Sequence, residues 1–158
     1  FMTFSGIIDF FVIKNDFQYQ IIDAPKNPDV LWIKNNTPPQ SVFLNSSYFY
    51  HPASLAGRKI FYGWPYYAWS AGYQTEERKE LVGEIFSQKE VKALCALLKA
   101  NHLDYVALED KPQIEEIENF DRSFWQKNFV PAYANKISGL KIYQTEAICL
   151  ILLPLEGR

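Results

Sequence analysis

The chain has little of several residue types that would direct its interpretation. Its 158 residues include one methionine, two cysteines and two histidines, and the formal net charge is only -2. Acidic and basic residues are interspersed, so no basic stripe indicates nucleic-acid binding. The longest uninterrupted apolar run, residues 147–155, is nine residues long and includes Pro154. A membrane-spanning helix needs about 20 residues. The composition therefore predicts no nucleic-acid partner and no membrane span.

Catalytic and metal-binding motifs are also missing. The sequence contains no phosphate-cradling glycine motif, nucleophile elbow, HExxH helix, internal repeat or low-complexity tract. Two cysteines are too few for a disulfide framework, and their spacing is not that of a zinc site. Cys95 falls on an apolar helix face and Cys149 in an apolar run, which favours buried thiols and leaves a bond between them open. These absences argue against a self-contained enzyme and predict no cofactor and no metal.

Aromatic side chains are in excess between Gly57 and Tyr73. Seven of the thirteen residues from Phe61 to Tyr73 are aromatic, against 16% of the whole chain. Pro65 biases the residue before it away from the helical region, so we expect an irregular loop after a short strand at 58–62. Rings with an apolar face and a polar tip suit stacking on sugars, or packing on a partner or a membrane interface. The alternative is a satellite core under a long loop. The candidate ligand-binding residues are Arg58, Trp64, Tyr66, Tyr67, Trp69 and Tyr73.

The elements expected along the chain predict one α/β domain over residues 1–158, which suits the length. The expected strands are 18–22, 41–45, 58–62, 103–108, 129–134, 140–144 and 147–153. The order of strand, helix and strand predicts a parallel crossover, and residues 135–139 predict a hairpin. The prediction is a three-layer sandwich with a mixed sheet, parallel in its middle and antiparallel at the C-terminal hairpin.

Three of the expected helices carry capping signals. Asn27 precedes Pro28, Thr75 precedes a helix at 76–86, and Ser87 to Glu90 form a capping-box pattern before a helix that ends near Asn101. Shorter helices are expected at 113–119 and 121–127, and residues 7–12 fit either a helix or a strand. Two sequon patterns, at Asn35 and Asn45, would accept a glycan only in a secretory setting.

Polar residues follow two of the expected strands. Residues 45–48, Tyr50 and His51 follow one strand, and Glu109 and Asp110 follow another. Ligands bind outside the carboxyl ends of the strands in α/β sheets, so these residues are candidates for the wall of a cleft. A soluble α/β enzyme would use His51, Glu109 and Asp110 as acid–base groups, and this requires that they converge in one pocket. The alternative is a solvated acidic loop and a histidine without a catalytic or metal role.

Residues 1–13 are mostly apolar and begin without an ordinary start methionine, although Thr3, Ser5, Gly6 and Asp9 interrupt them. This predicts a fragment cut from a larger protein, with residues 1–13 as a membrane-proximal segment. A basic region followed by a small-residue cleavage site is missing, so the segment is not typical of a signal peptide.

Several segments carry a resemblance to a known family. In order they are SGIIDFF, WIKNNTPP, SVFLN, LAGRKIFYGWPYYAWSAGY, ERKELVGEIF, LDYVALED, FVPAYAN and LKIYQT. They resemble the soluble C-terminal domain of polytopic membrane glycosyltransferases of the GT-C type, which use polyprenyl-phosphate-linked sugars, and of related multi-spanning proteins. The resemblance covers residues 5–144, and its most recognisable pieces are Gly57-Arg58 with Gly63-Trp64, and Asp104-Tyr105-Val106.

The resemblance implies an extracytoplasmic domain tethered to a membrane-embedded catalytic body, which would be its partner. Catalytic acidic residues of that family lie between early membrane spans, so Asp9, Asp104, Glu109 and Asp110 inherit no catalytic role. The expected function is a noncatalytic accessory domain that binds a glycan, an acceptor or a polyprenyl-phosphate-linked sugar. The rings would stack on the sugar, and Arg58 would hold a phosphate or carboxylate. The alternative is a purely structural or interaction domain that supports the membrane part.

Overall fold

The computed structural model describes residues 23–48, 50–114, 117 and 120–151. Within these residues a five-stranded sheet has the order β2-β1-β3-β5-β4. The strands are β1 (Val42–Asn45), β2 (Lys59–Ile60), β3 (Tyr105–Leu108), β4 (Tyr133–Ala134) and β5 (Lys141–Gln144). β1 pairs in parallel with both β2 and β3, and β5 pairs antiparallel with both β3 and β4. The predicted α/β fold, with its mixed sheet and C-terminal hairpin, is confirmed.

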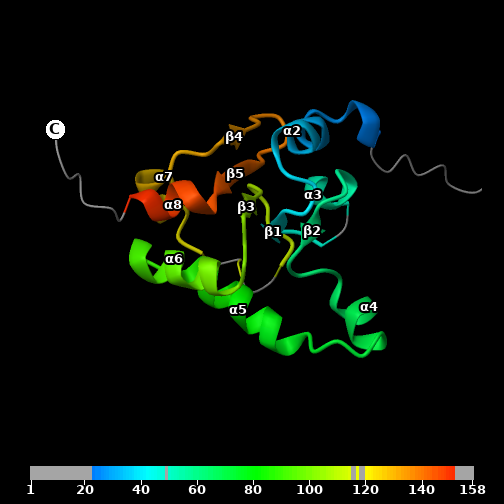
Figure 1. Cartoon of the computed structure of the whole chain (residues 1–158), viewed down its shortest axis with the longest axis horizontal. Coiled ribbons are helices and arrows are strands. Elements are labelled where there is room, and N and C mark those ends of the chain that lie inside the picture. Colours follow the sequence, from blue (N-terminus) through cyan, green and yellow to red (C-terminus); the bar gives the residue numbers. More distant parts are fainter. Residues whose placement is uncertain (1–22, 49, 115–116, 118–119, 152–158) are drawn as a thin grey trace, which may run out of the picture.

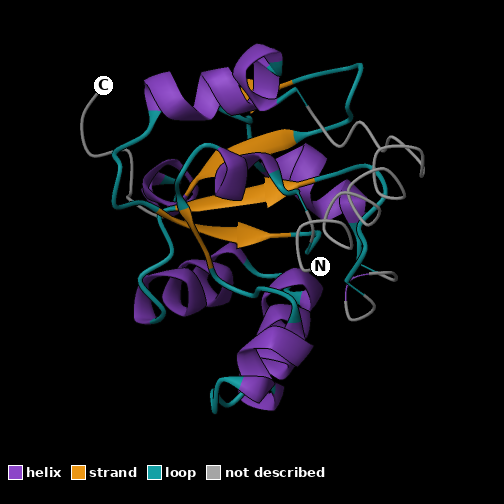
Figure 2. Ribbon diagram, turned by 90° about the vertical axis from the view of Figure 1, so that its right-hand side faces the viewer, coloured by secondary structure: helices purple, strands orange, loops and turns teal. Residues whose placement is uncertain are grey.

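Helices lie on both sides of this sheet (Figures 1 and 2). They are the 3-10 helix η1 (Ala24–Lys26) and the α-helices α2 (Pro28–Asn36), α3 (Pro52–Leu55), α4 (Pro65–Ser70), α5 (Glu76–Ser87), α6 (Val91–Ala100), α7 (Arg122–Asn128) and α8 (Thr145–Leu150). In the described part of the chain, no helix has the length and apolar character needed to cross a membrane.

Successive strand residues point to opposite faces of the sheet and build two hydrophobic clusters. Phe43 packs with Val30 and Ile33 of α2, while the next residue, Leu44, packs with side chains of α5 to α8. The same alternation continues along β3 and β5. Because both faces of the strands are covered, their apolar runs are continuous, as expected for buried parallel strands.

Helix α2 begins and is anchored as its sequence predicts. The side chain of Asn27 accepts hydrogen bonds from Asp29 N at 2.9 Å and Val30 N at 3.2 Å. Asp29 is buried, and its Oδ1 accepts hydrogen bonds from Tyr133 Oη at 2.7 Å and Asn135 Nδ2 at 2.6 Å. Burial, aided by the bond to Asp29, raises the pKa of Tyr133 to about 12. Asp29 therefore joins α2 to the hairpin of β4 and β5.

Two of the predicted capping interactions are wrong, although the helices themselves form. The side chain of Thr75 makes no capping hydrogen bond to α5. Ser87 belongs to the end of α5, where its hydroxyl donates to Glu84 O, and Glu90 precedes α6 without a capping bond. Burial of Phe86 carries α5 one residue further than its sequence signals indicate, and a serine inside a helix bonds to the preceding turn instead.

The irregular loop expected after Trp64 is a short helix, α4. Trp64 is extended, with φ -62° and ψ 116°, as the following proline requires. Pro65 then occupies the first helical position, where a missing N–H costs no hydrogen bond. The proline therefore starts a helix instead of preventing one.

The strand expected at 147–153 is also wrong in its described part, because residues 145–150 form α8. A short apolar run is compatible with a buried helix or a buried strand, so periodicity does not decide between them. Cys149 on α8 forms a disulfide with Cys95 on α6, which overturns the interpretation of both as buried thiols. The elements expected at 7–12 and 18–22, the segment 1–13 and most of 113–119 lie outside the described residues.

Candidate aromatic binding groove

A groove of about 680 Å³ lies at the carboxyl edge of the parallel strands. Tyr48 follows β1, Tyr62 and Trp64 follow β2, and Gln113 follows β3. The start of α5 and helix α4 close the other sides, with Pro65, Tyr66, Trp69, Thr75, Glu76 and Lys79. Ligands of α/β sheets bind at this edge, so the groove lies where the fold places binding sites.

Asn45, the last residue of β1, holds the floor of this groove together. Its Oδ1 accepts a hydrogen bond from Tyr62 N at 3.0 Å, and its Nδ2 donates to Tyr62 O at 2.6 Å and to Ser47 O at 2.9 Å. The side chain thus replaces backbone pairing beyond the two-residue strand β2. Asn45 is fully buried, so the sequon pattern there does not offer its amide to a glycan in the folded chain.

Aromatic rings form a continuous series from the interior to the surface. Tyr48 meets Tyr62 edge-on at 5.6 Å between ring centroids and Trp64 at 5.3 Å, and Trp64 meets Tyr66 at 5.4 Å. Tyr62 is buried with 3% of its surface exposed, whereas Tyr66 is 67% exposed. The inner rings therefore fix the outer ones against the sheet edge.

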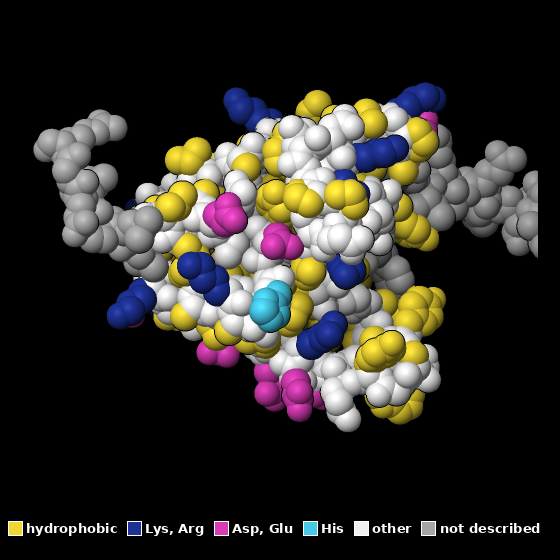
Figure 3. Space-filling model, viewed as in Figure 1, with side chains coloured by type: hydrophobic (Ala, Val, Ile, Leu, Met, Phe, Trp, Pro, Cys, Tyr) yellow, Lys and Arg dark blue, Asp and Glu magenta, His cyan; other side chains and the backbone are white. Residues whose placement is uncertain are grey.

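Helix α4 buries none of its residues and stands away from the body of the domain (Figure 1). Tyr67, Trp69 and Tyr73 are 72%, 70% and 68% exposed, and hydrophobic side chains gather at this end of the molecule (Figure 3). The satellite-core alternative therefore fails for these outer rings. The rings also separate into groups, because Trp69 lines the groove, Tyr73 lines a second cavity of about 400 Å³, and Tyr67 lines neither.

Arg58 does not join the aromatic residues. Its Nε donates to Thr37 Oγ1 at 3.0 Å and its Nη1 to Ala56 O at 3.0 Å. Its Nη2 donates to Lys34 O at 2.9 Å and to Thr37 O at 2.8 Å. Arg58 precedes β2, so it lies at the amino end of a strand whose carboxyl end meets the groove. The guanidinium ties the end of α2 to the sheet, and the expected phosphate contact has no support from its position.

His51, which the enzyme hypothesis uses as an acid–base group, is fully buried. Its Nδ1 accepts a hydrogen bond from Ala53 N at 3.2 Å and caps α3. Burial lowers the pKa of His51 to about 4, although the charge of Asp29 acts in the opposite direction. Its contacts in the described part of the chain include neither Glu109 nor Asp110.

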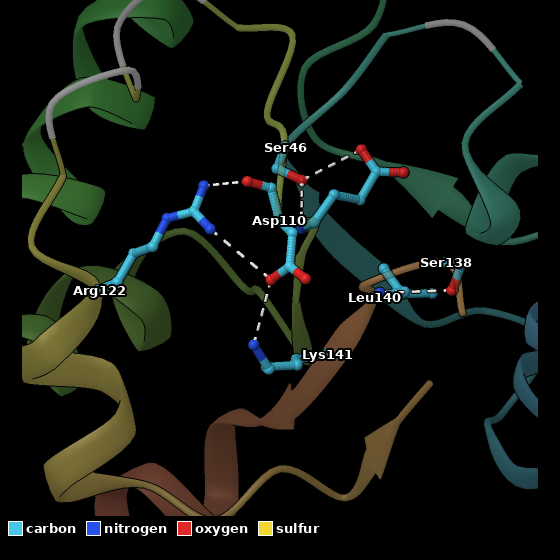
Figure 4. A network of polar contacts seen from close by, with 7 residues as sticks. Ser46, Asp110, Arg122, Ser138, Leu140 and Lys141 are labelled. Atoms are coloured by element: carbon cyan, nitrogen blue, oxygen red, sulfur yellow. Dashed lines mark hydrogen bonds and ion pairs between the residues drawn. The ribbon is translucent and has the colours of Figure 1, made fainter. Parts of the chain in front are cut away.

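The two carboxylates that follow β3 point to different partners. Ser46 Oγ accepts a hydrogen bond from Glu109 N at 2.9 Å and donates to Glu109 Oε2 at 3.4 Å. Burial raises the pKa of Glu109, and the hydroxyl groups beside it oppose this. Asp110 forms ion pairs with Lys141 at 3.2 Å and Arg122 at 3.6 Å (Figure 4). The structure therefore does not bring the three residues of the enzyme hypothesis together.

Sequence reasoning identified part of the groove and missed part of it. Trp64, Tyr66 and Trp69 were candidates because of their local density, and Tyr48 because it follows a strand. Thr75, Glu76, Lys79 and Gln113 were not candidates. Only their position could have identified them as groove residues, because they lie at the start of a helix or follow a strand. Among the described residues, no group of three or more His, Cys, Asp or Glu side chains is placed to hold a metal ion.

Comparison of the chain with protein-family models and with curated proteins finds no match. The resemblance to membrane glycosyltransferase domains therefore stays a prediction.

Proposed function

We propose that the domain is a noncatalytic glycan-binding module that holds sugar rings in the aromatic groove. The observation that carries this proposal is the lining of the groove at the carboxyl edge of three parallel strands. Its five rings belong to Tyr48, Tyr62, Trp64, Tyr66 and Trp69. A pyranose presents one apolar C–H face and an edge of hydroxyl groups. Aromatic walls with polar groups at one end match both features.

The proposed setting is the extracytoplasmic side of a membrane, where the domain would be tethered to the membrane-embedded part of a glycosyltransferase-like protein. The resemblance of residues 5–144 supports this setting. The Cys95–Cys149 disulfide supports it as well, because disulfides persist in oxidising compartments outside the cytosol. The sugar in the groove would belong to a glycan acceptor or to a polyprenyl-phosphate-linked donor.

A structural or interaction role is the second candidate, and one observation favours it. Tyr67 lines neither cavity and is 72% exposed on a helix that buries no residue. An exposed apolar surface of this kind often marks a contact with another protein. In this alternative, α4 would pack against the membrane part of the parent protein and the groove would stay empty.

A titration of the full chain with neutral and lipid-linked glycans separates the two candidates. Tryptophan fluorescence and ligand-observed NMR detect the binding. We expect saturable binding that weakens about fivefold in Trp69→Ala, because a stacking ring contributes about 1 kcal/mol. Tyr67→Ala is the matched control, since its ring is equally exposed but does not line the groove. Absence of any glycan binding, or equal affinities of the wild type and Trp69→Ala, would contradict the proposal.

A further inference from the structure

Thr75 stands at the polar end of the groove with an unused hydroxyl group. Only 8% of its surface is exposed, and it lines both the groove and the second cavity. Among the described residues, its side chain has no hydrogen-bond partner and does not cap α5. The backbone explains this, because Thr75 has φ -96° and ψ -31°, whereas a capping residue is normally extended. The hydroxyl group is therefore available to a ligand in the groove.

The start of α5 adds polar side chains at the same place. Thr75 provides no capping oxygen, but the amide groups left without a side-chain acceptor include those of Glu77 and Arg78, which line the second cavity and not the groove. Helix α5 contributes the side chains of Glu76 and Lys79 to the groove. Thr75, Glu76 and Lys79 therefore offer hydrogen-bonding side chains to the hydroxyl groups of a ligand.

The charges of the groove decide which kind of ligand fits. Its lining contains one carboxylate, on Glu76, and one ammonium group, on Lys79. These formal charges cancel, and the remaining lining residues are aromatic side chains, Pro65, the hydroxyl of Thr75 and the amide of Gln113. A phosphate or carboxylate on the ligand would meet Glu76 without a net positive charge to offset it. A sugar hydroxyl can donate to the carboxylate and accept from an amide or ammonium group.

We infer that the groove selects uncharged sugars, and that Thr75 and the start of α5 bind their hydroxyl groups while the rings stack on their C–H faces. This inference rests on the proposed glycan-binding function and names the ligand class of the same site. Thr75 is then a specificity-determining residue, and a lipid-linked ligand would enter the groove with its sugar and leave its phosphate outside.

The test compares neutral and charged probes on the full chain. The neutral probes are methyl glucoside, methyl mannoside and neutral oligosaccharides built from them, and the charged probes are the corresponding sugar phosphates and methyl glucuronide. We expect the neutral probes to bind at least about tenfold more tightly than the charged probes. Thr75→Val should lower the affinity for the neutral probes about fivefold, because one hydrogen bond is lost. Thr75→Ser, which keeps the hydroxyl, should restore binding.

Thr145→Val is the matched control. Thr145 is a buried threonine whose hydroxyl has no partner in the described part of the chain, but it lies beside Ser41 and Leu103 at the amino edge of the parallel strands, away from the groove. The affinity of Thr145→Val for the neutral probes should equal that of the wild type.

Tighter binding of charged probes, or unchanged binding in Thr75→Val, would overturn the inference and leave glycan binding intact. If no sugar binds, the proposed function itself fails and the inference falls with it. The probe comparison needs only the wild-type chain, so it decides even if a variant does not fold.

Discussion

The fully buried imidazole of His51 links the stability of the domain to pH. Its pKa is about 4 in the folded chain and 6.5 in its ordinary state, and its Nε2 has no partner among the described residues. Between these two values the unfolded chain binds a proton that the folded chain excludes. Proton binding therefore favours the unfolded chain at low pH. The contribution of neutral His51 to stability is fully present above pH 6.5 and is lost as the pH falls toward about 4.

A change from about pH 7 to about pH 4 should lower the free energy of unfolding by about 3 kcal/mol through His51 alone. His51→Asn should remove this contribution, because asparagine keeps a capping oxygen for α3 but does not titrate. Urea unfolding of both proteins across this pH range measures the difference. Parallel pH profiles would show that His51 is not the titrating group.

At the scale of elements, the β4–β5 hairpin depends on a glycine that packs against the end of β3. Gly139 has φ 74°, and a Cβ placed on it would lie 2.6 Å from Asp110 Oδ2 and 2.8 Å from Asp110 Cβ. The ion pairs with Lys141 and Arg122 hold Asp110 in place (Figure 4). The close approach and the backbone conformation therefore both require glycine here.

Gly139→Ala should lower the free energy of unfolding by about 2–3 kcal/mol, of which about 1 kcal/mol reflects the left-handed backbone. Gly57→Ala is the matched control, because Gly57 has φ 73° but no atom within 4 Å of the added Cβ. Gly57→Ala should lower the free energy of unfolding only by the backbone contribution of about 1 kcal/mol. Urea denaturation of the two variants gives the comparison, and equal losses would mean that Asp110 moves aside without cost.

At the scale of the whole molecule, the disulfide joins the crossover helix α6 to the last helix α8. Cys95 and Cys149 are 54 residues apart, and the segment between them includes β3 and the hairpin. The bond restricts the unfolded chain over a long loop. Such a restriction stabilises the folded state mainly by lowering the entropy of the unfolded state.

Reduction of this bond should lower the free energy of unfolding by about 4 kcal/mol on the chain-entropy account. Urea unfolding with and without a reductant measures the loss, once complete reduction has been verified by mass spectrometry. The double variant Cys95→Ala with Cys149→Ala should be less stable than the oxidised wild type and insensitive to the reductant. An unchanged midpoint for the fully reduced wild type would contradict the prediction.

The α/β class, the parallel strands and the hairpin were predictable because their signals are local. Residues 41–45 and 103–108 are short apolar runs, residues 135–139 contain turn-forming types, and Asn27 before Pro28 is a complete helix start. The density of rings after Phe61 likewise identified Trp64, Tyr66 and Trp69 without any tertiary information. Each of these signals depends only on neighbours along the chain.

Tertiary structure decided the features that depend on contacts between distant residues. The apolar run after Gln144 is a helix that is joined to α6 by the disulfide of Cys149. Arg58 donates hydrogen bonds to the end of α2 and does not face the rings. The groove itself unites Tyr48, Thr75 and Gln113, which are far apart in sequence. The order of the strands brings their carboxyl ends to one edge, and this order is set by packing across the whole sheet and by no single segment.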